Sequence, residues 1–278
     1  MKTFKNKLAI VTGGGSGIGR SLSMGLARAG ASVAVTDIHE DRAGQVAGEV
    51  RALGAEAWGL GVDHGNKEAA GKFADQFISE HGCPDILCLN AGVGHGAPLE
   101  RISLEDWEWV LGVNLWGVIY MLHHFVPKMI ERQQGGGILI TSSIAGFSPL
   151  PGMSPYCTSK YALMGLSESL RAELGAHNIG VSALCPGFIN TNIVKNGKID
   201  LRDDKGASRS GDVVKFYATK GVSPDLVARD GLRALRRDIG IMPSPLHAWP
   251  QYLLHRLSPV LYNAVLKFSW KRGFPFGK

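Results

Sequence analysis

Short apolar runs alternate with stretches of helical periodicity along residues 1–242. The runs that predict buried strands occupy residues 8–11, 31–36, 57–62, 86–89, 138–140 and 181–185. Stretches with helical spacing lie between them, at residues 22–29, 41–53, 67–80, 103–132 and 156–177, and a helix at 224–237 and a last strand at 239–242 follow. This alternation favours an α/β fold, a doubly wound Rossmann-type parallel sheet with helices on both faces.

The pattern predicts one domain with a tail. Residues 1–242 form the predicted Rossmann-type domain. Within it, residues 192–222 are polar and glycine-dotted, so we expect a mobile lid with few apolar anchors. Residues 243–278 form a C-terminal extension, in which Ser258 and Pro259 suit the N-cap and first position of a helix over 259–272.

A glycine-rich turn, TGGGSGIG at residues 12–19, follows the first predicted strand directly. Glycines let the backbone approach a pyrophosphate, and the N-terminus of the next helix offers free N–H groups. Asp37 ends the second strand, where a carboxylate accepts hydrogen bonds from ribose hydroxyls and repels a 2′-phosphate. No Arg directly follows Asp37, and we expect Arg42 on the outer face of the next helix. The pattern therefore predicts NAD rather than NADP.

Tyr156 and Lys160 stand four residues apart on a predicted helix, so their side chains share one face. An ammonium beside a phenol favours the phenolate and lowers the pKa of the phenol, which suits a general acid/base. Ser142 and Ser143 end the preceding strand, and either hydroxyl is placed to bind a substrate oxygen.

These motifs, in this order, resemble the short-chain dehydrogenase/reductase family in its ordinary single-domain form. The resemblance covers about residues 5–192. It rests on the TGxxxGIG turn, Asp37, Asp63, the NAG turn at 90–92, Asn114, Ser143, the YxxxK pair Tyr156 and Lys160, and a Pro-Gly pair followed by Thr191.

The resemblance implies a catalytic set of Asn114, Ser143, Tyr156 and Lys160. Tyr156 would exchange a proton with the substrate oxygen as hydride passes to or from nicotinamide. Lys160 would bind the nicotinamide ribose and lower the pKa of Tyr156, while Ser143 would hold the reacting oxygen. Ser143 is preferred to Ser142 because it lies at the family's usual spacing before the tyrosine. Asn114 would anchor a water, unless it makes only a polar contact between helices.

The resemblance also implies a set of residues that hold NAD. They are Gly13, Gly15, Ser16, Gly17, Ile18, Gly19, Asp37, Asp63, Asn90, Ala91, Gly92, Tyr156, Lys160, Pro186, Gly187, Ile189 and Thr191. Thr191 would bond the carboxamide of the nicotinamide. Asn90 is expected to stabilise the sheet edge rather than to act in catalysis.

Apolar residues flank the catalytic positions in sequence and predict an apolar substrate pocket. They are Phe147, Leu150, Met153, Phe188 and Ile193, which would bind substrate together with Ser143. Such a pocket favours a lipophilic alcohol or ketone, such as a steroid, terpenoid or acyl-chain compound, over a sugar. Core packing is the alternative for each of them, and His95 is expected to be a solvated loop residue.

Composition narrows the class of protein. A chain with 45% hydrophobic and 19% charged residues suits a large buried core. The four cysteines form no C-x-x-C pair and predict reduced thiols in a cytoplasmic protein, and the nine histidines show no metal-binding spacing. The first apolar run is too short for a signal peptide.

Positive charge is concentrated near the C-terminus. Residues 229–278 contain nine Lys or Arg and two Asp, a local charge of +7, so the other residues sum to −1 out of a total of +6. This distribution argues against nucleic acid as a partner. A basic, aromatic tail suits peripheral association with the surface of an anionic membrane; packing on the body or on a partner subunit is the alternative.

Three functions remain in view. The first is an NAD(H)-dependent oxidoreductase that interconverts a secondary alcohol and a ketone on a small-molecule substrate. The second is a catalytically idle NAD-binding sensor or scaffold, and the third an epimerase or dehydratase on the same fold. A homo-oligomer, dimer or tetramer, is expected. The glycine-rich ending that shapes the tetramer in many relatives is absent from the printed sequence.

Overall fold

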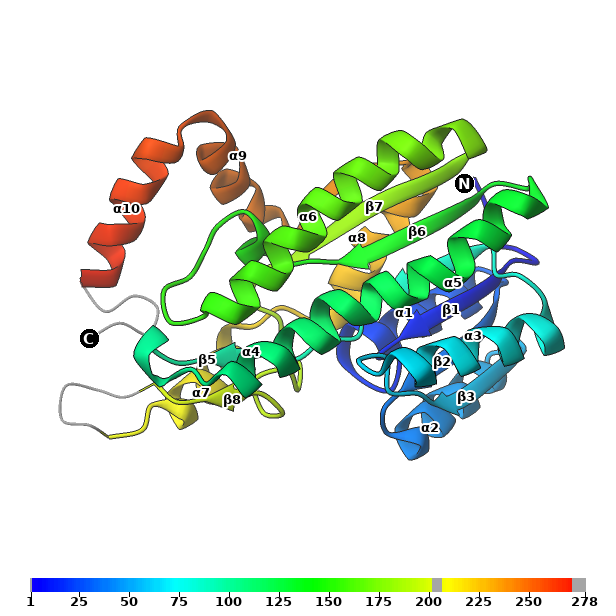
Figure 1. The fold of residues 1–278 in the computed structure, drawn as a ribbon, viewed down its shortest axis with the longest axis horizontal. Helices are drawn as coiled ribbons and strands as arrows, with labels where there is room; N and C mark the ends of the chain where they lie inside the picture. Colours follow the sequence, from blue (N-terminus) through cyan, green and yellow to red (C-terminus); the bar gives the residue numbers. More distant parts are fainter. Residues whose placement is uncertain (1, 202–206, 272–278) are drawn as a thin grey trace.

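The computed structural model describes residues 2–201 and 207–271 and has a seven-stranded parallel sheet at its centre (Figure 1). The strands lie in the order β3-β2-β1-β4-β6-β7-β9. Their bounds are β1 (Leu8–Thr12), β2 (Ser32–Asp37), β3 (Ala57–Gly61), β4 (Ile86–Leu89), β6 (Gly136–Thr141), β7 (Ile179–Pro186) and β9 (Ile241–Ser244). The doubly wound α/β fold predicted from the sequence is confirmed.

Helices cover both faces of the sheet because successive strand residues point to opposite sides. Val11 packs toward α1 (Gly17–Arg28), α2 (Glu40–Ala52) and α8 (Pro224–Arg237). Its neighbour Ile10 belongs to the core on the other face. That face is covered by α3 (Lys67–His81), α5 (Gly117–Arg132) and α6 (Ser154–Leu174).

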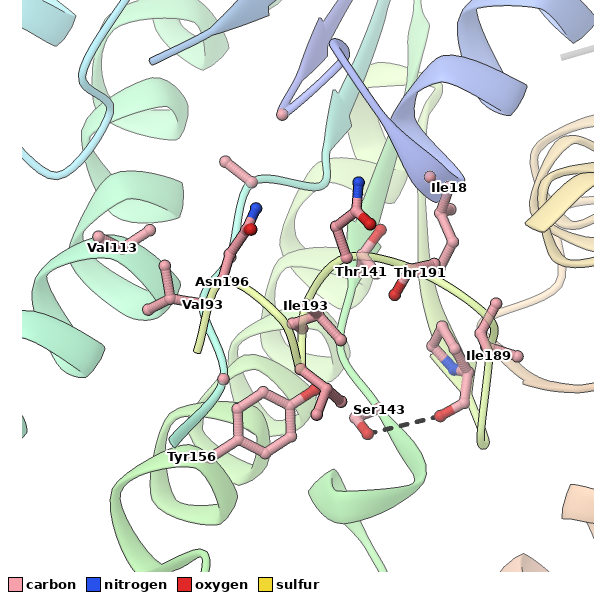
Figure 2. A pocket seen from close by; sticks show the side chains of 18 of the residues that line it. Ile18, Val93, Val113, Thr141, Ser143, Tyr156, Ile189, Thr191, Ile193 and Asn196 are labelled. Carbon is pink, nitrogen blue, oxygen red and sulfur yellow. Dashed lines mark hydrogen bonds between the residues drawn. The ribbon is translucent and has the colours of Figure 1, made fainter. Parts of the chain in front are cut away.

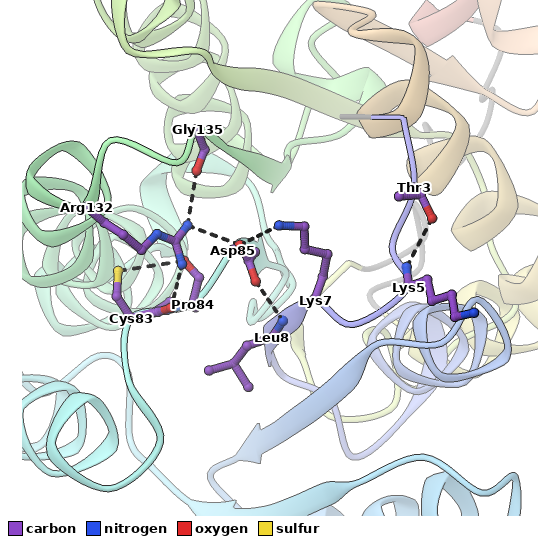
Figure 3. A network of polar contacts seen from close by, with 9 residues as sticks. All are labelled: Thr3, Lys5, Lys7, Leu8, Cys83, Pro84, Asp85, Arg132 and Gly135. Carbon is purple, nitrogen blue, oxygen red and sulfur yellow. Dashed lines mark hydrogen bonds and ion pairs between the residues drawn. The ribbon is translucent and has the colours of Figure 1, made fainter.

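Hydrogen bonds and ion pairs around Asp85 link the amino ends of the central strands (Figure 3). Asp85 precedes β4 and is 8% exposed. Its Oδ2 accepts from the N–H of Leu8 at 3.0 Å, and its Oδ1 lies 3.0 Å from Lys7 Nζ and 3.2 Å from Arg132 Nη2. The carboxylate therefore joins β1, β4 and the end of α5 at the sheet edge opposite the site described below.

The predicted helix over 103–132 is present, with one local change. Ser103 caps α4 (Leu104–Leu111), its Oγ accepting from the N–H of Asp106 at 3.1 Å. A π-helical turn (Gly112–Trp116) then leads into α5. Such turns often occur at functional sites, and this one contains Asn114.

The segment expected to be a mobile lid is better anchored than predicted. It contains β8 (Lys198–Ile199), which pairs with β5 (His95–Gly96), and helix α7 (Ser210–Lys220). Val194, Leu201 and Val213 are buried in a small apolar cluster of their own. The expectation of few apolar anchors was therefore wrong for the described part, and residues 202–206 of the lid lie outside it.

The C-terminal extension forms two helices, α9 (Trp249–Leu257) and α10 (Pro259–Lys271). They make a hairpin at one end of the molecule, beside α6 (Figure 1). The predicted helix start at Pro259 is observed, whereas the predicted end at residue 272 lies outside the described residues. The last strand, β9, runs two residues later than the predicted 239–242.

Candidate active site

The glycine turn brings three strand ends close to the start of α1. Gly13 and Gly17 have φ values of +61° and +51°, in the region that favours glycine. A Cβ on Gly13 would lie 2.8 Å from Ala91 Cα, and one on Gly19 would lie 2.1 Å from the Gly13 oxygen. Ser16 precedes α1 and makes no side-chain cap bond. The first N–H groups of the helix are thus left for a ligand.

Asp37 lies beside this turn, at the carboxyl end of β2. Its Oδ2 accepts from the N–H of Gly15 at 3.0 Å, and its Oδ1 accepts from the N–H of His39 at 3.1 Å. Each oxygen keeps a further lone pair for a ribose hydroxyl. Arg42, expected on the outer helix face, instead lines the same cavity as Asp37. Arg42 lies in the first turn of α2 and faces the cavity, so the expectation of an outward-facing Arg42 was wrong.

Asn90 braces the ends of β1, β4 and β6. Its Nδ2 donates to the carbonyls of Thr12 and Gly13 at 3.2 and 3.3 Å, and its Oδ1 accepts from Thr141 Oγ1 at 3.3 Å. These bonds agree with the structural role expected for Asn90. In the loop after β3, the Oδ1 of Asp63 accepts from the N–H of Gly65 at 2.9 Å, and Asp63 lines the cavity.

Ser143 and Tyr156 point into the cavity at the carboxyl end of β6 (Figure 2). Ser143 Oγ donates to the Pro186 carbonyl at 3.4 Å and accepts from the N–H of Ala145 at 3.1 Å. Ser142, the alternative, donates instead to the Lys160 carbonyl at 2.9 Å and ties β6 to α6. The geometry therefore favours Ser143 as the serine beside the tyrosine.

The Lys160 ammonium lies over one face of the Tyr156 ring. Its Nζ lies 5.6 Å from the ring centroid and donates to the Thr141 carbonyl at 2.9 Å. Burial lowers the pKa of Lys160 to about 8, so the ammonium still predominates near neutral pH.

The sequence predicted a lowered pKa for Tyr156, but the structure shows that the opposing effect on this pKa is larger. Burial raises the pKa of Tyr156 to about 12, and its hydrogen bond with Ser143 lowers the pKa only in part. Desolvation dominates because the phenolate would carry its charge in a poorly hydrated position. The resting tyrosine is a phenol, ready to donate a proton.

Asn114 is fully buried in the π-helical turn. Its Oδ1 accepts from the N–H of Val93 at 2.7 Å, and its Nδ2 donates to the Val93 carbonyl at 3.0 Å and to Ser159 Oγ at 3.2 Å. Ser159 Oγ in turn donates to the Tyr156 carbonyl at 2.7 Å. With both amide protons used, the Asn114 side chain holds the catalytic helix in place, as in the alternative of a polar contact between helices.

One cavity of about 450 Å³ collects most of the predicted residues. The lining includes Gly13, Ser16, Gly17, Ile18, Asp37, Asp63, Asn90, Ala91, Gly92, Ser143, Leu150, Met153, Tyr156, Lys160, Pro186, Gly187, Phe188, Ile189, Thr191 and Ile193. Gly15, Gly19 and Asn114 lie behind this lining and support it.

Phe147 was expected in the substrate pocket but is not part of the lining. It is 5% exposed and lies with its ring centroid 5.1 Å from that of Tyr252 on α9. The Phe147 ring therefore packs on the C-terminal extension, outside the cavity.

The lid supplies lining residues that the sequence analysis missed. They are Val194, Asn196, Ile199, Leu201, Val213 and Tyr217. Asn196 and Tyr217 are the polar members of this set, and the pKa of Tyr217 on α7 is raised by burial and by the neighbouring Tyr156. The spacing of Val213 and Tyr217, four residues apart, was the signal available in the sequence for an inward helix face.

His95 is buried rather than solvated. It is 3% exposed, and its Nε2 lies 3.4 Å from Asp106 Oδ2. Asp106 Oδ1 also pairs with Lys198 Nζ at 2.6 Å. Because Lys198 belongs to β8, this group fastens the lid to the start of α4.

The described residues fit a dinucleotide. A glycine-rich turn lies against the start of α1, and a carboxylate lies at the end of β2. The cavity then runs from Asp37 past Thr191 to Tyr156. A bound dinucleotide would place its adenosine ribose at Asp37 and its nicotinamide near Tyr156 and Lys160.

Comparison with known proteins agrees with this geometry. The family model for short chain dehydrogenases matches residues 7–201. The probable oxidoreductase EphD of Mycobacterium tuberculosis is 37% identical over 259 residues, 92% of this chain. The chain spans only 44% of the length of that relative.

Two further similarities bear on the site. A 1-deoxy-11-beta-hydroxypentalenate dehydrogenase from Streptomyces exfoliatus is 36% identical over 193 residues, covering 69% of this chain and 70% of the relative. A short chain dehydrogenase/reductase from Burkholderia phymatum, solved in complex with NAD, superposes with a TM-score of 0.86 at 28% identity, over 94% of this chain and 96% of the other. The chain belongs to the short-chain dehydrogenase/reductase family.

Proposed function

We propose that this protein interconverts a lipophilic secondary alcohol and the corresponding ketone with NAD(H). The observation that carries the proposal is the single cavity in which Ser143 and Tyr156 stand between a dinucleotide cradle and an apolar wall. Leu150, Met153 and Phe188 line that wall on one side of Tyr156, and the lid contributes further apolar side chains.

The chain's own groups account for the proton transfer. Bound NAD supplies a hydride acceptor, and NADH a hydride donor. For ketone reduction, the Tyr156 phenol donates its proton to the carbonyl oxygen while Ser143 Oγ donates a hydrogen bond to the same oxygen. For alcohol oxidation, the Tyr156 oxygen accepts the hydroxyl proton. The Lys160 ammonium favours the phenolate that this direction requires.

Asp37 supports the choice of NAD. Its carboxylate faces the cavity where a 2′-phosphate would bring like charge, although Arg42 lines the same end. The similar structure from Burkholderia phymatum is described as a complex with NAD. The relative from Streptomyces exfoliatus is named as a dehydrogenase of a hydroxypentalenate, which supports oxidation of a hydroxyl group on a small molecule.

A panel assay of NADH formation tests the function. The panel pairs lipophilic secondary alcohols with polyols of similar size, each assayed with NAD and with NADP. We expect net NADH with the lipophilic members. Turnover confined to the polyols would contradict the proposed substrate class, and product formed without net NADH would favour the epimerase or dehydratase. Cofactor binding without turnover across the panel would favour the idle sensor.

A further inference from the structure

The C-terminal hairpin of α9 and α10 exposes large apolar side chains. Leu257 and Val260 are each 82% exposed, and Phe268, Leu261 and Leu253 follow at 56%, 53% and 48%; Leu246, just before α9, is also 82% exposed. Leu253 and Leu257 are four residues apart on α9, and Leu261 and Val265 are four apart on α10. Such spacing puts apolar side chains in stripes along each helix, on surface that the described body does not cover.

The hairpin is nevertheless fixed to the body. Tyr262 is 6% exposed, and its hydroxyl is hydrogen-bonded to Ser148 Oγ. On α9, Tyr252 packs on Phe147, and Arg256 Nη1 lies 4.0 Å from Glu168 Oε1 on α6. One side of the hairpin is thus held against the loop that follows β6, which leaves the stripes facing outward.

Charge decides which partner suits this surface. Residues 239–278 contain five Lys or Arg and no Asp or Glu. Arg256 and Lys267 stand among the exposed apolar residues, with side chains accessible to solvent. A two-fold contact between hairpins would place cations against cations. An anionic lipid surface provides an apolar layer for the leucines and negative headgroups for Lys267.

The hairpin also lies next to the apolar end of the active-site cavity. Leu266 of α10 borders a shallow groove together with Leu150, Pro151 and Tyr161. Leu150 and Pro151 line the substrate cavity as well. One loop therefore separates the cavity from the surface on which the hairpin lies.

We propose that the α9–α10 hairpin docks the enzyme onto an anionic lipid bilayer, with the substrate cavity close to the membrane surface. The contact is peripheral, because α9 and α10 have 9 and 13 residues, whereas a spanning helix needs about 20. The helix at Leu104–Arg132 is long and apolar enough to span a membrane, but its Met121 and Phe125 belong to the core of the body.

Vesicle sedimentation of the full chain tests this inference. The test variant combines Leu257→Gln, Val260→Gln and Leu261→Gln, which leaves the charge unchanged and alters only exposed positions. The matched control combines Leu99→Gln and Leu104→Gln, at body positions that are 65% and 76% exposed. Each substitution removes apolar surface that would enter the bilayer, so the triple variant should bind at least about a hundredfold more weakly.

We expect the wild type and the control to sediment at low salt with phosphatidylcholine vesicles that contain phosphatidylserine, and to bind pure phosphatidylcholine much more weakly. The triple variant should stay in the supernatant. Two results would overturn the proposal. One is a wild type that stays in solution with anionic vesicles, or sediments no better than the triple variant. The other concerns the oligomeric state, measured by ultracentrifugation without vesicles. If the wild type were a dimer or larger oligomer and the triple variant a smaller species, the hairpin would be a contact between copies of the chain. Neither readout depends on turnover, so failure here leaves the proposed reaction standing.

Discussion

At the scale of single residues, the polar groups around the site divide into those that hold the backbone and those left to meet a ligand. The side chains of Ser142, Ser159 and Asn114 form hydrogen bonds with neighbouring main-chain groups or with each other. Ser143 and Tyr156 face the cavity. Residue type alone could not distinguish Ser142 from Ser143, and the spacing to Tyr156 favoured Ser143. The structure agrees, because the Ser142 hydroxyl is bonded to the Lys160 carbonyl.

The Asp37 carboxylate predicts cofactor choice. Replacing it with alanine removes the acceptors for ribose hydroxyls and the like charge that a 2′-phosphate would meet. We expect Asp37→Ala to lower kcat/KM for NAD by about tenfold to a hundredfold, the range for hydrogen bonds to a charged group. The value for NADP should fall far less or rise.

Steady-state kinetics with both cofactors check this, with Asp41→Ala, an exposed acid on α2, as the matched control. Wild-type values of kcat/KM that are comparable for NAD and NADP would show that Arg42, and not Asp37, dominates this end of the cavity.

The buried side chain of His64 should make the free energy of unfolding depend on pH. Its Nε2 lies 2.8 Å from Thr36 Oγ1, and burial lowers its pKa to about 4 from 6.5. Between these values the unfolded chain binds a proton that the folded chain does not, so the free energy of unfolding falls as pH drops from about 6.5 to 4. The loss from this residue should total roughly 3 kcal/mol.

Urea unfolding at a series of pH values measures that loss. In His64→Gln the slope over this window should flatten, whereas in His177→Gln, an exposed control, it should not. An unchanged slope in His64→Gln would assign the acid sensitivity to other groups.

At the scale of elements, the strands and the helices on the sheet were predictable because apolar runs and helical periodicity mark them directly. Boundaries shifted by a few residues, as with β9 at Ile241–Ser244. The lid was harder, because α7 and β8 are short and their apolar residues pack on each other rather than on the sheet. The inward turn of Arg42 and the burial of His95 depend on contacts between elements distant in sequence, which periodicity cannot report.

The lid helix α7 predicts a role for Tyr217 in substrate binding. Its hydroxyl lies near Tyr156 at the apolar end of the cavity. We expect Tyr217→Phe to lower kcat/KM for the alcohol by about threefold to tenfold, the cost of one neutral hydrogen bond, while KM for NAD stays unchanged.

Tyr120→Phe on α5, where the ring stacks on Trp116, is the control for loss of a phenol elsewhere. If KM for NAD rose in parallel in Tyr217→Phe, the residue would be acting on the lid fold and not on the substrate.

At the scale of the whole molecule, the parallel sheet explains why residues so far apart in sequence meet. Every strand of the central sheet runs the same way, so the turns after β1, β2, β4, β6 and β7 gather at one edge. The Asp85 cluster fastens the opposite edge (Figure 3). The C-terminal extension lay beyond what this pattern could specify, because only its contact with Ser148 and Phe147 shows which side faces outward.

The central claim is that Tyr156 transfers the proton in an NAD-dependent alcohol–ketone interconversion. The most direct test compares kcat and the KM for NAD in wild type, Tyr156→Phe and Tyr161→Phe, the last lying on the same helix but outside the cavity. Tyr156→Phe should lose at least about a hundredfold in kcat, the contribution of a general acid/base, with a nearly unchanged KM for NAD, and Tyr161→Phe should keep its turnover. A Tyr156→Phe enzyme that retained most of its turnover would contradict the account.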